Sequence, residues 1–345
     1  MAKSPDNIRL EDSLKNISTA DSDHCSKAGS GPVVSVYTIC YNQEKYIRQT
    51  LDGILLQQTD FPIEAIVVDD ASTDSTPDII REYAAKWPDI FRPVLLKENY
   101  YSSNRSKFLD IYLPMARGEF MAICEGDDYW TYPLKLQRQV EFLRRHPDYS
   151  ACFHLYNLKN ETEIKRSTPA SRILRSRTCG VKEIIVEETV QTASIVARLD
   201  ALKNDPELMQ DLRESPRSVI DRRFYLSLLA TGKVYVFKRR WSVYRLNKKG
   251  ISYIDKRDDA FDKHIARFRW FSTKYGGRFA DLPEQALAER KVHDEFYSAL
   301  DKISDAFYSR KFRKGIGPLL RISFRMPKLT YVHAIAIYRN HHAKE

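Results

Sequence analysis

The fold of this chain is decided by the stretch VVSVYTICYNQEKYIRQTLDGILLQ, residues 33–57. Its first seven residues, 33–39, form an apolar run rich in β-branched side chains, which predicts a strand buried in a parallel sheet. Apolar side chains then recur three and four positions apart, which predicts an amphipathic helix; they are Tyr46, Ile47, Leu51, Ile54 and Leu55. The stretch therefore predicts one strand–helix unit of an α/β protein.

The same unit recurs up to about residue 156. Further strands are predicted at 63–68, 93–96, 119–124 and 150–156, and further helices from Thr76, near 106–117 and at 135–145. Thr76 followed by Pro77 is typical of an N-cap and a first-turn proline. The alternation predicts an α/β fold, namely a doubly wound, mostly parallel sheet with flanking helices. Ligands of such sheets bind beyond the carboxyl ends of the strands.

Two pairs of adjacent carboxylates follow predicted strands, Asp69-Asp70 and Asp127-Asp128. Neighbouring carboxylates repel each other, so a compensating group is required, and Mg²⁺ or Mn²⁺ is the usual one for carboxylate oxygens. The alternative is that each pair caps the next helix. Two such pairs at strand ends of one sheet favour the metal.

The segment after the first predicted strand, residues 38–42, lacks a glycine-rich phosphate loop. This argues against a dinucleotide-dependent oxidoreductase, a P-loop NTPase and a sugar nucleotidyltransferase. A diphosphate would then be held by a metal rather than by backbone amides.

Composition excludes several classes of protein. The 345-residue chain is 43% hydrophobic and 30% charged, which excludes wholesale disorder. No apolar run approaches the roughly 20 residues that span a bilayer, and the polar N-terminus lacks the apolar stretch of a secretory signal. Five cysteines without a CxxC pair exclude a disulfide framework and a recognisable zinc site. We therefore expect a cytoplasmic protein.

The net charge of +10 is concentrated near the C-terminus. Residues 302–345 hold ten Lys or Arg and two acidic residues, a net +8. Such a stretch can bind nucleic acid, bind an anionic membrane surface, or form a solvated face.

Three regions are expected. Residues 1–31 form a flexible polar tail, and residues 256–345 form a helical, basic C-terminal region. The central domain spans 32–255, with a first half at 32–156 and a second half at 157–255. The second half begins with a polar stretch, 157–185, that is predicted to be a loop.

Four segments together resemble family 2 glycosyltransferases of the GT-A fold, in particular bacterial members that build surface polysaccharides. They are residues 33–57, IVVDDASTDSTPDII at 66–80, ARGEFMAICEGDDYW at 116–130 and PLKLQRQVEFLRRHPDYSACFH at 133–154. The resemblance is strong over 33–155 and weak over 186–252. It implies that 32–255 is a GT-A glycosyltransferase domain, with a nucleotide-sugar half at 32–156 and an acceptor half at 157–255.

The resemblance implies a role for each matching residue. Thr38, Tyr41, Asn42 and Glu44 would line the nucleobase pocket, and Asp70 would accept a hydrogen bond from the base. Asp127 would lie near the ribose and the metal, and Asp128 would ligate the cation that bridges the diphosphate. Further nucleotide-sugar contacts would come from Lys107, Trp130 and Arg245, although Lys107 can equally be an exposed helix residue and Trp130 a core aromatic.

The chain departs from the family pattern in three places. Thr38 replaces a usual proline, Asn247 stands where a histidine would complete the metal site, and the acceptor-side acidic motif is the unusual segment 219–224. The catalytic base implied at that motif is Asp221, with an N-cap or a surface ion pair as the alternative. Other candidate bases are Glu187, Glu188, Asp211 and Glu214.

The resemblance and the charge chemistry together predict an inverting, metal-dependent transfer of a sugar from a nucleotide-diphosphate sugar. A UDP-sugar is the favoured donor, Mn²⁺ or Mg²⁺ the cofactor, and a glycan or lipid-linked molecule the acceptor. The alternatives are a sugar nucleotidyltransferase and a non-enzymatic protein that binds nucleic acid or membranes. No nucleic-acid partner is expected. The segment 310–328 mixes cations with apolar residues, so it is suited either to an anionic membrane on the cytoplasmic side or to packing on the catalytic domain.

Overall fold

The computed structural model describes residues 31–103, 105–160, 163–167, 173–186, 189–214 and 220–247, with seven isolated positions between 269 and 284. Side chains are not described at positions 186, 220 and 221. Contacts divide the chain into two units, Met1–Ala260 and Phe261–Glu345. The predicted tail, apart from Gly31, and nearly all of the predicted region 256–345 lie outside the described residues.

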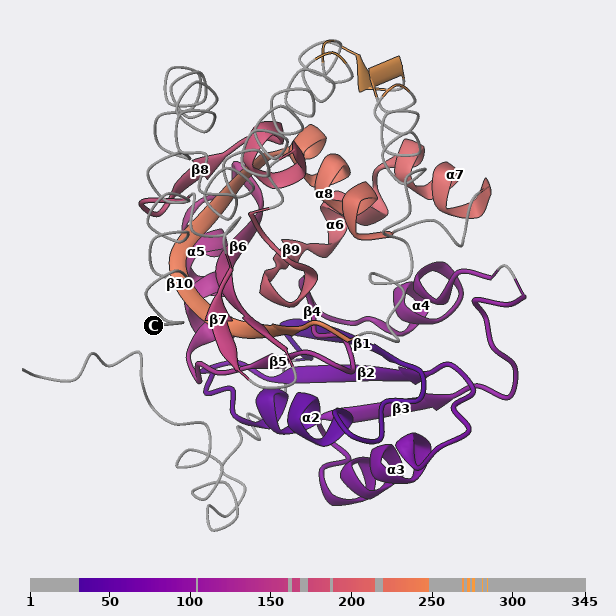
Figure 1. The fold of residues 1–345 in the computed structure, drawn as a ribbon. Coiled ribbons are helices and arrows are strands. Elements are labelled where there is room, and N and C mark those ends of the chain that lie inside the picture. The colour runs from indigo at the N-terminus through magenta and orange to yellow at the C-terminus, as the bar shows by residue number, and fades with distance from the viewer. Residues whose placement is uncertain are drawn as a thin grey trace, which may run out of the picture. The chain divides into compact units, whose positions relative to one another are not determined.

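A ten-stranded sheet runs through the first unit (Figure 1). Its main path has the order β3-β2-β1-β4-β9-β6-β10-β5, while β7 pairs with β6 and β8 with β10. The strands are β1 Val34–Cys40, β2 Ile63–Asp69, β3 Phe91–Leu95, β4 Phe120–Ile123, β5 Tyr129–Trp130, β6 Tyr149–Lys159, β7 Ile164–Arg166, β8 Arg177–Cys179, β9 Val196–Arg198 and β10 Lys233–Arg245. The longest ladders, β6 with β10 and those among β1, β2, β3 and β4, are parallel. The predicted α/β fold with a mostly parallel sheet is confirmed.

Helices connect these strands, and most lie where the sequence predicts them. They are α2 Ile47–Leu55, α3 Thr76–Lys86, α4 Leu113–Met115, α5 Lys135–Arg145, α6 Leu199–Lys203, α7 Pro206–Glu214 and α8 Ile220–Thr231, with π-helical turns at Phe108–Tyr112 and Lys182–Val186 and a 3-10 turn at Thr192–Ser194. Thr76 is the first helical residue of α3 and Ser75 is the N-cap, so the predicted cap was wrong by one position. The Thr76 amide donates instead to Asp74 Oδ1 at 3.0 Å.

Side chains alternate between the two faces along each strand, so the apolar strands need packing partners on both faces of the sheet. Val34 and Val36 of β1 belong to a core cluster shared with α2, α3 and α5. Tyr37 points to the opposite face, where its ring centroid lies 4.6 Å from that of Tyr112, and Phe108 lies 4.5 Å from Phe224 of α8. In Figure 1, α2 and α3 lie below strands β1–β3 and α4 lies above them.

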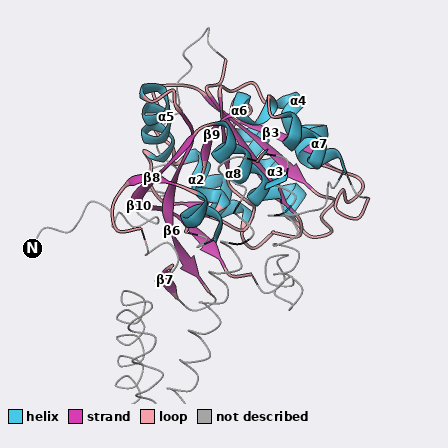
Figure 2. Ribbon diagram, turned by 90° about the horizontal axis from the view of Figure 1, so that it is seen from above, coloured by secondary structure: helices cyan, strands magenta, loops and turns pink. Residues whose placement is uncertain are grey.

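The region 157–185 is not simply the loop that its polar sequence predicted. β6 continues to Lys159 and pairs antiparallel with β7, beside which it lies in Figure 2. β8 pairs antiparallel with β10. These short strands form because the long strands β6 and β10 offer backbone partners, an effect that local hydrophobic patterning does not reveal.

Two further features agree with the composition. None of the helices in the described part of the chain is long and apolar enough to cross a membrane. The four described cysteines, Cys40, Cys124, Cys152 and Cys179, are buried and form no disulfide.

Candidate active site

The two acidic segments meet at one edge of the sheet, on either side of the end of β1. β1 lies between β2 and β4, and all three are parallel, so their carboxyl ends share an edge. The Asp70 amide donates to Cys40 O at 2.9 Å, and the Gly126 amide donates to Ile39 O at 2.9 Å. A Cβ on Gly126 would lie only 2.6 Å from the Cys40 Cβ, so this close approach requires glycine.

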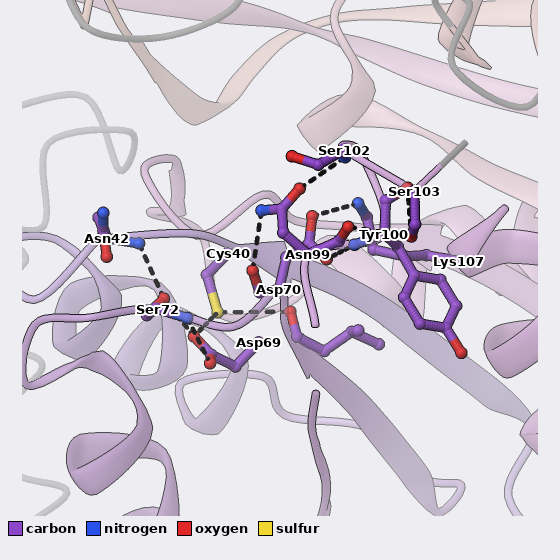
Figure 3. Close-up of polar contacts among 11 residues, drawn as sticks. Cys40, Asn42, Asp69, Asp70, Ser72, Asn99, Tyr100, Ser102, Ser103 and Lys107 are labelled. Atoms are coloured by element: carbon purple, nitrogen blue, oxygen red, sulfur yellow. Dashed lines mark hydrogen bonds and ion pairs between the residues drawn. The ribbon is translucent and has the colours of Figure 1, made fainter. Parts of the chain in front are cut away.

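The first acidic pair is satisfied by protein groups. Asp69 Oδ2 accepts the Ser72 amide at 3.0 Å, within the turn that follows β2. Asp70 Oδ1 accepts the Tyr100 amide at 2.7 Å, and Asp70 Oδ2 lies 2.6 Å from Lys107 Nζ (Figure 3). The contacts of this pair therefore require no metal. They also differ from the alternative considered for the sequence, in which the pair caps the next helix.

The loops after β1 and β2 hold each other in place. Asn42 has a φ of 53° and Ala71 a φ of 61°, the left-handed region that non-glycine residues seldom adopt. The Asn42 amide donates to Ser72 Oγ at 2.8 Å (Figure 3), and Glu44 Oε2 accepts the Ser75 amide at 3.1 Å. Tyr41, which is 48% exposed, leaves its ring open to a ligand.

The second acidic pair is different, because it retains an unsatisfied oxygen. Asp128 is completely buried; its Oδ1 accepts the Arg245 amide at 2.9 Å, and its Oδ2 has no hydrogen-bond partner among the described residues. Asp127 Oδ2 lies 3.4 Å from the Asn247 side-chain nitrogen. Burial raises the pKa of both carboxyls, and the negative charges of Asp127 and Glu125 raise the pKa of Asp128 further. The pair therefore favours binding of a proton or a cation.

The residues at this pair fit a hard divalent cation, because carboxylate oxygens are its preferred protein ligands. Within the described residues, no group of three or more His, Cys, Asp and Glu side chains could hold a metal. Two protein carboxylates with further oxygens from a bound phosphate is the arrangement that Mg²⁺ adopts in many nucleotide sites. Asp127 and Asp128 would supply the protein share of that set.

Two of the predicted contact residues are too deeply buried to line an open site. Thr38 is fully buried within β1. Trp130 is also fully buried, and its indole nitrogen donates to Ala193 O at 2.7 Å, so its ring belongs to the core. Neither side chain reaches the protein surface, and their contact with a nucleotide-sugar stays a prediction.

Arg245 is held by protein groups on every side. It is only 8% exposed, and its guanidinium donates to Asp127 O and to Gln49 Oε1. Burial lowers its pKa. In this structure Arg245 thus contacts the acidic pair, and its contact with the donor stays a prediction.

The acceptor-side candidates are only partly described. Asp221 is the second residue of α8, but its side chain lies outside the described set, as do Glu187 and Glu188 entirely. Asp211 Oδ2 lies 2.7 Å from Arg223 Nε in a largely buried ion pair. Glu214 Oε1 accepts the Gln210 side-chain nitrogen at 2.6 Å. Asp211 is therefore engaged by Arg223, and its role as a base stays a prediction.

Several contacts around the acidic pair were not foreseen. Thr50 is fully buried in α2, and its hydroxyl lies 2.9 Å from Gly126 O and 2.7 Å from Asp128 O. Thr192 Oγ1 donates to Glu125 Oε2 at 2.6 Å, which ties the acceptor-side segment to the same turn. In the sequence, Thr50 could have been noticed only as a threonine among the apolar positions of the predicted helix.

Comparison with known proteins identifies the family. Residues 35–197 match the model of "Glycosyl transferase family 2". This match places residues 35–197 in glycosyltransferase family 2. The matched region contains both acidic pairs and the strands that carry them.

Two curated relatives illustrate the range of the family members that this chain resembles. An uncharacterized protein of Mycobacterium tuberculosis, Rv1520, is 40% identical over 65% of this chain and 62% of its own length. The match thus spans less than two thirds of that relative. The putative teichuronic acid biosynthesis glycosyltransferase TuaG of Bacillus subtilis is 29% identical over 64% of this chain and 82% of its own length.

Solved structures of the GT-A type share the fold. TarS from S. aureus, crystallised with UDP-GlcNAc, has a TM-score of 0.56 at 21% identity over 74% of this chain and 70% of its own. The mannosyltransferase PcManGT from Pyrobaculum calidifontis, in complex with GDP-Man and Mn²⁺, has a TM-score of 0.53 at 19% identity over 96% of this chain and 88% of its own. At these identities the likeness establishes the fold alone.

Proposed function

We propose that this chain transfers a sugar from a nucleotide-diphosphate sugar to an acceptor hydroxyl, with inversion at the sugar carbon and with a divalent cation at Asp127 and Asp128. The observation that carries the proposal is the fully buried Asp128, whose Oδ2 has no partner among the described residues, at a strand end beside Asp127. Membership of family 2 supports the reaction type.

The proposed chemistry follows from the charges that develop during transfer. Breaking the sugar–phosphate bond leaves negative charge on the diphosphate and positive character on the sugar. A bound Mg²⁺ or Mn²⁺ supplies electrostatic stabilisation of that diphosphate, typically worth several kcal/mol. Asp127 and Asp128 hold and orient the cation, and Asp221 removes the proton from the acceptor hydroxyl. One base without an enzyme nucleophile corresponds to a single displacement.

A UDP-sugar is the donor that we favour. Asp70 stands at the end of β2, and each carboxylate oxygen can accept more than one hydrogen bond, so it can accept the uracil N3–H while keeping Lys107 and Tyr100. The exposed ring of Tyr41 adds an aromatic surface for the base. The complex of TarS with UDP-GlcNAc supports this choice. Because PcManGT was solved in complex with GDP-Man, GDP-sugars are included in the experiment described below.

The acceptor that we favour is a glycan or lipid-linked molecule of surface polysaccharide synthesis. The likeness to TuaG supports this setting. A lipid-linked acceptor would give the basic segment 310–328, which lies outside the described residues, a role at an anionic membrane surface.

The test is a panel of UDP-, GDP- and dTDP-sugars, scored for nucleotide diphosphate release with Mg²⁺ or Mn²⁺. We expect release of UDP that depends on the cation and is lost in Asp128→Asn. Pyrophosphate release from UTP and a sugar 1-phosphate would instead indicate a nucleotidyltransferase. Binding of nucleic acid or vesicles that survives Asp128→Asn, without any turnover, would indicate a non-enzymatic binder.

A further inference from the structure

Arg245, the last residue of β10, contacts both members of the acidic pair. Its backbone amide donates to Asp128 Oδ1 at 2.9 Å, and its guanidinium donates to the backbone oxygen of Asp127. The second terminal nitrogen of the guanidinium donates to Gln49 Oε1 on α2. One residue of β10 thus links the turn after β4 to helix α2.

Two aromatic rings also lie close to this guanidinium. Its central carbon lies 4.9 Å from the ring centroid of Tyr46 and 4.6 Å from that of Tyr129. These distances lie within the range of cation–π attraction. With Arg245 only 8% exposed, the contacts leave little guanidinium surface for a diphosphate.

Helix α2 holds the same turn by a second route. The buried Thr50 hydroxyl lies within hydrogen-bond distance of Gly126 O and Asp128 O. Gly126 is fixed against β1 through its amide. The backbone on both sides of Asp127 is therefore fixed by α2 and β1, and Arg245 adds the bonds that reach Asp127 O and the Asp128 carboxylate.

We propose that Arg245 is a positioning residue that orients Asp127 and Asp128 for the cation, and that it acts through them rather than on the donor. This inference rests on the proposed function. Its physical basis is that two adjacent carboxylates repel each other, whereas the positive guanidinium beside them attracts both, and its planar donors fix the Asp127 backbone oxygen relative to Gln49. Lysine would preserve the charge but not the two-armed link from Asp127 to Gln49.

The experiment compares Arg245→Met, Arg245→Lys and Gln49→Leu with wild type. The matched control is Arg48→Met, which removes an exposed arginine of α2 that pairs with Glu82 and lies 5.9 Å from a tyrosine ring but does not contact the acidic pair. Thermal unfolding first establishes which variants fold. Mn²⁺ affinity is then measured by electron paramagnetic resonance in the presence of UDP, followed by kcat and donor KM at several Mn²⁺ concentrations.

We expect at least a tenfold loss of Mn²⁺ affinity in Arg245→Met, a smaller loss in Arg245→Lys and in Gln49→Leu, and no change in Arg48→Met. Raising the Mn²⁺ concentration should recover part of kcat in Arg245→Met, with donor KM at saturating metal within about threefold of wild type. A purely structural role would lower the unfolding temperature without changing the Mn²⁺ affinity of the folded fraction.

Folded Arg245→Met with Mn²⁺ affinity within twofold of wild type would overturn the inference and leave the proposed function intact. If Arg245→Met does not fold, Gln49→Leu decides the question, and unchanged Mn²⁺ affinity in that variant overturns the inference. A donor KM that rises tenfold at saturating metal, with Mn²⁺ affinity unchanged, would instead make Arg245 a direct donor contact. Absence of UDP-dependent Mn²⁺ binding in wild type would overturn the proposed function as well.

Discussion

Lys107 Nζ lies 2.6 Å from Asp70 Oδ2, and the two side chains are only 14% and 4% exposed. Asp70 directly follows β2 and Lys107 directly precedes the π-helical turn at Phe108–Tyr112, so the ion pair joins two segments that are distant in the sequence (Figure 3). Tyr100 and Asn99 add bonds from the same segment to Asp70. The first acidic segment is therefore organised by protein contacts, while the second keeps an oxygen for a ligand.

Asp70→Ala is expected to weaken UDP binding by about 1.5–3 kcal/mol, the range for a hydrogen bond that involves a charged group. Isothermal calorimetry with UDP measures the change. Asp78→Ala serves as the control, because Asp78 is an exposed carboxylate that pairs only with Arg81 in the described contacts of its side chain. Unchanged affinity in Asp70→Ala would remove Asp70 from the base pocket and reopen the choice of nucleotide.

Asp128→Asn is expected to abolish UDP-dependent Mn²⁺ binding and turnover while the protein remains folded. Burial raises the pKa of Asp128, so the folded protein binds this proton more tightly than the unfolded chain does. The resulting contribution to the free energy of unfolding is fully present below the unfolded-state pKa and is lost as the pH rises through the folded-state pKa. The asparagine variant should therefore be at least as stable as wild type at neutral pH without metal. Calorimetry and thermal scans test both points, with the exposed Asp89→Asn as control; wild-type turnover in excess chelator would contradict the metal role.

The buried Lys135 predicts that the free energy of unfolding depends on pH above neutrality. It is fully buried, its Nζ has no hydrogen-bond partner among the described residues, and it lies 4.0 Å from the Trp130 ring. Burial lowers its pKa to about 7, and the ionisable groups that face it are Cys124, Cys152 and His154.

Because the unfolded chain binds this proton more tightly, the free energy of unfolding should rise with pH above about 7, by at most about 1.4 kcal/mol per pH unit. Lys135→Met removes this dependence, so its stability advantage over wild type should be largest at pH 7 and below and should shrink towards pH 9. Urea unfolding at several pH values measures it, with the exposed Lys45→Met as control. Parallel pH profiles for wild type and Lys135→Met would show that Lys135 remains charged in the folded protein.

Asp221→Asn is expected to lower kcat by at least about 10², the lower end for general base catalysis, with little change in the Kd of the donor. Single-turnover and binding measurements separate these quantities. Glu163→Gln, which alters an exposed carboxylate that pairs with Lys165 and is not a candidate base, is the control. Should donor affinity collapse, or activity persist, Asp221 is structural and Glu187 or Glu188 becomes the next candidate.

Vesicles containing anionic lipid should retain the full chain in a flotation experiment and lose a chain that ends near residue 305. The reason is the net +8 charge of residues 302–345, combined with the apolar side chains of 310–328. High salt should release the full chain. Equal behaviour of the two proteins would leave the segment with a packing role only.

The carboxyl-end placement of Asp70 and Asp127 could be predicted from the sequence. Each residue follows a short apolar run that predicts a strand, and parallel strands end at one edge of a sheet. The helices that connect the strands show clear apolar periodicity, at positions such as Leu51 and Val140. The strands β7 and β8 could not be predicted, because they exist through pairing with β6 and β10. Trp130 was ambiguous for a similar reason, since only the packed structure shows which aromatic side chains are enclosed.

The sequence by itself determined the α/β architecture, the family and the positions of the two acidic pairs, because these depend on local periodicity and on motifs close in the chain. Only the tertiary structure decided which pair is already satisfied. Lys107 lies 37 residues from Asp70, and Arg245 lies 117 residues from Asp128. No local pattern encodes such long-range contacts, because a hydrogen bond between distant residues forms only after the strands that carry them have assembled.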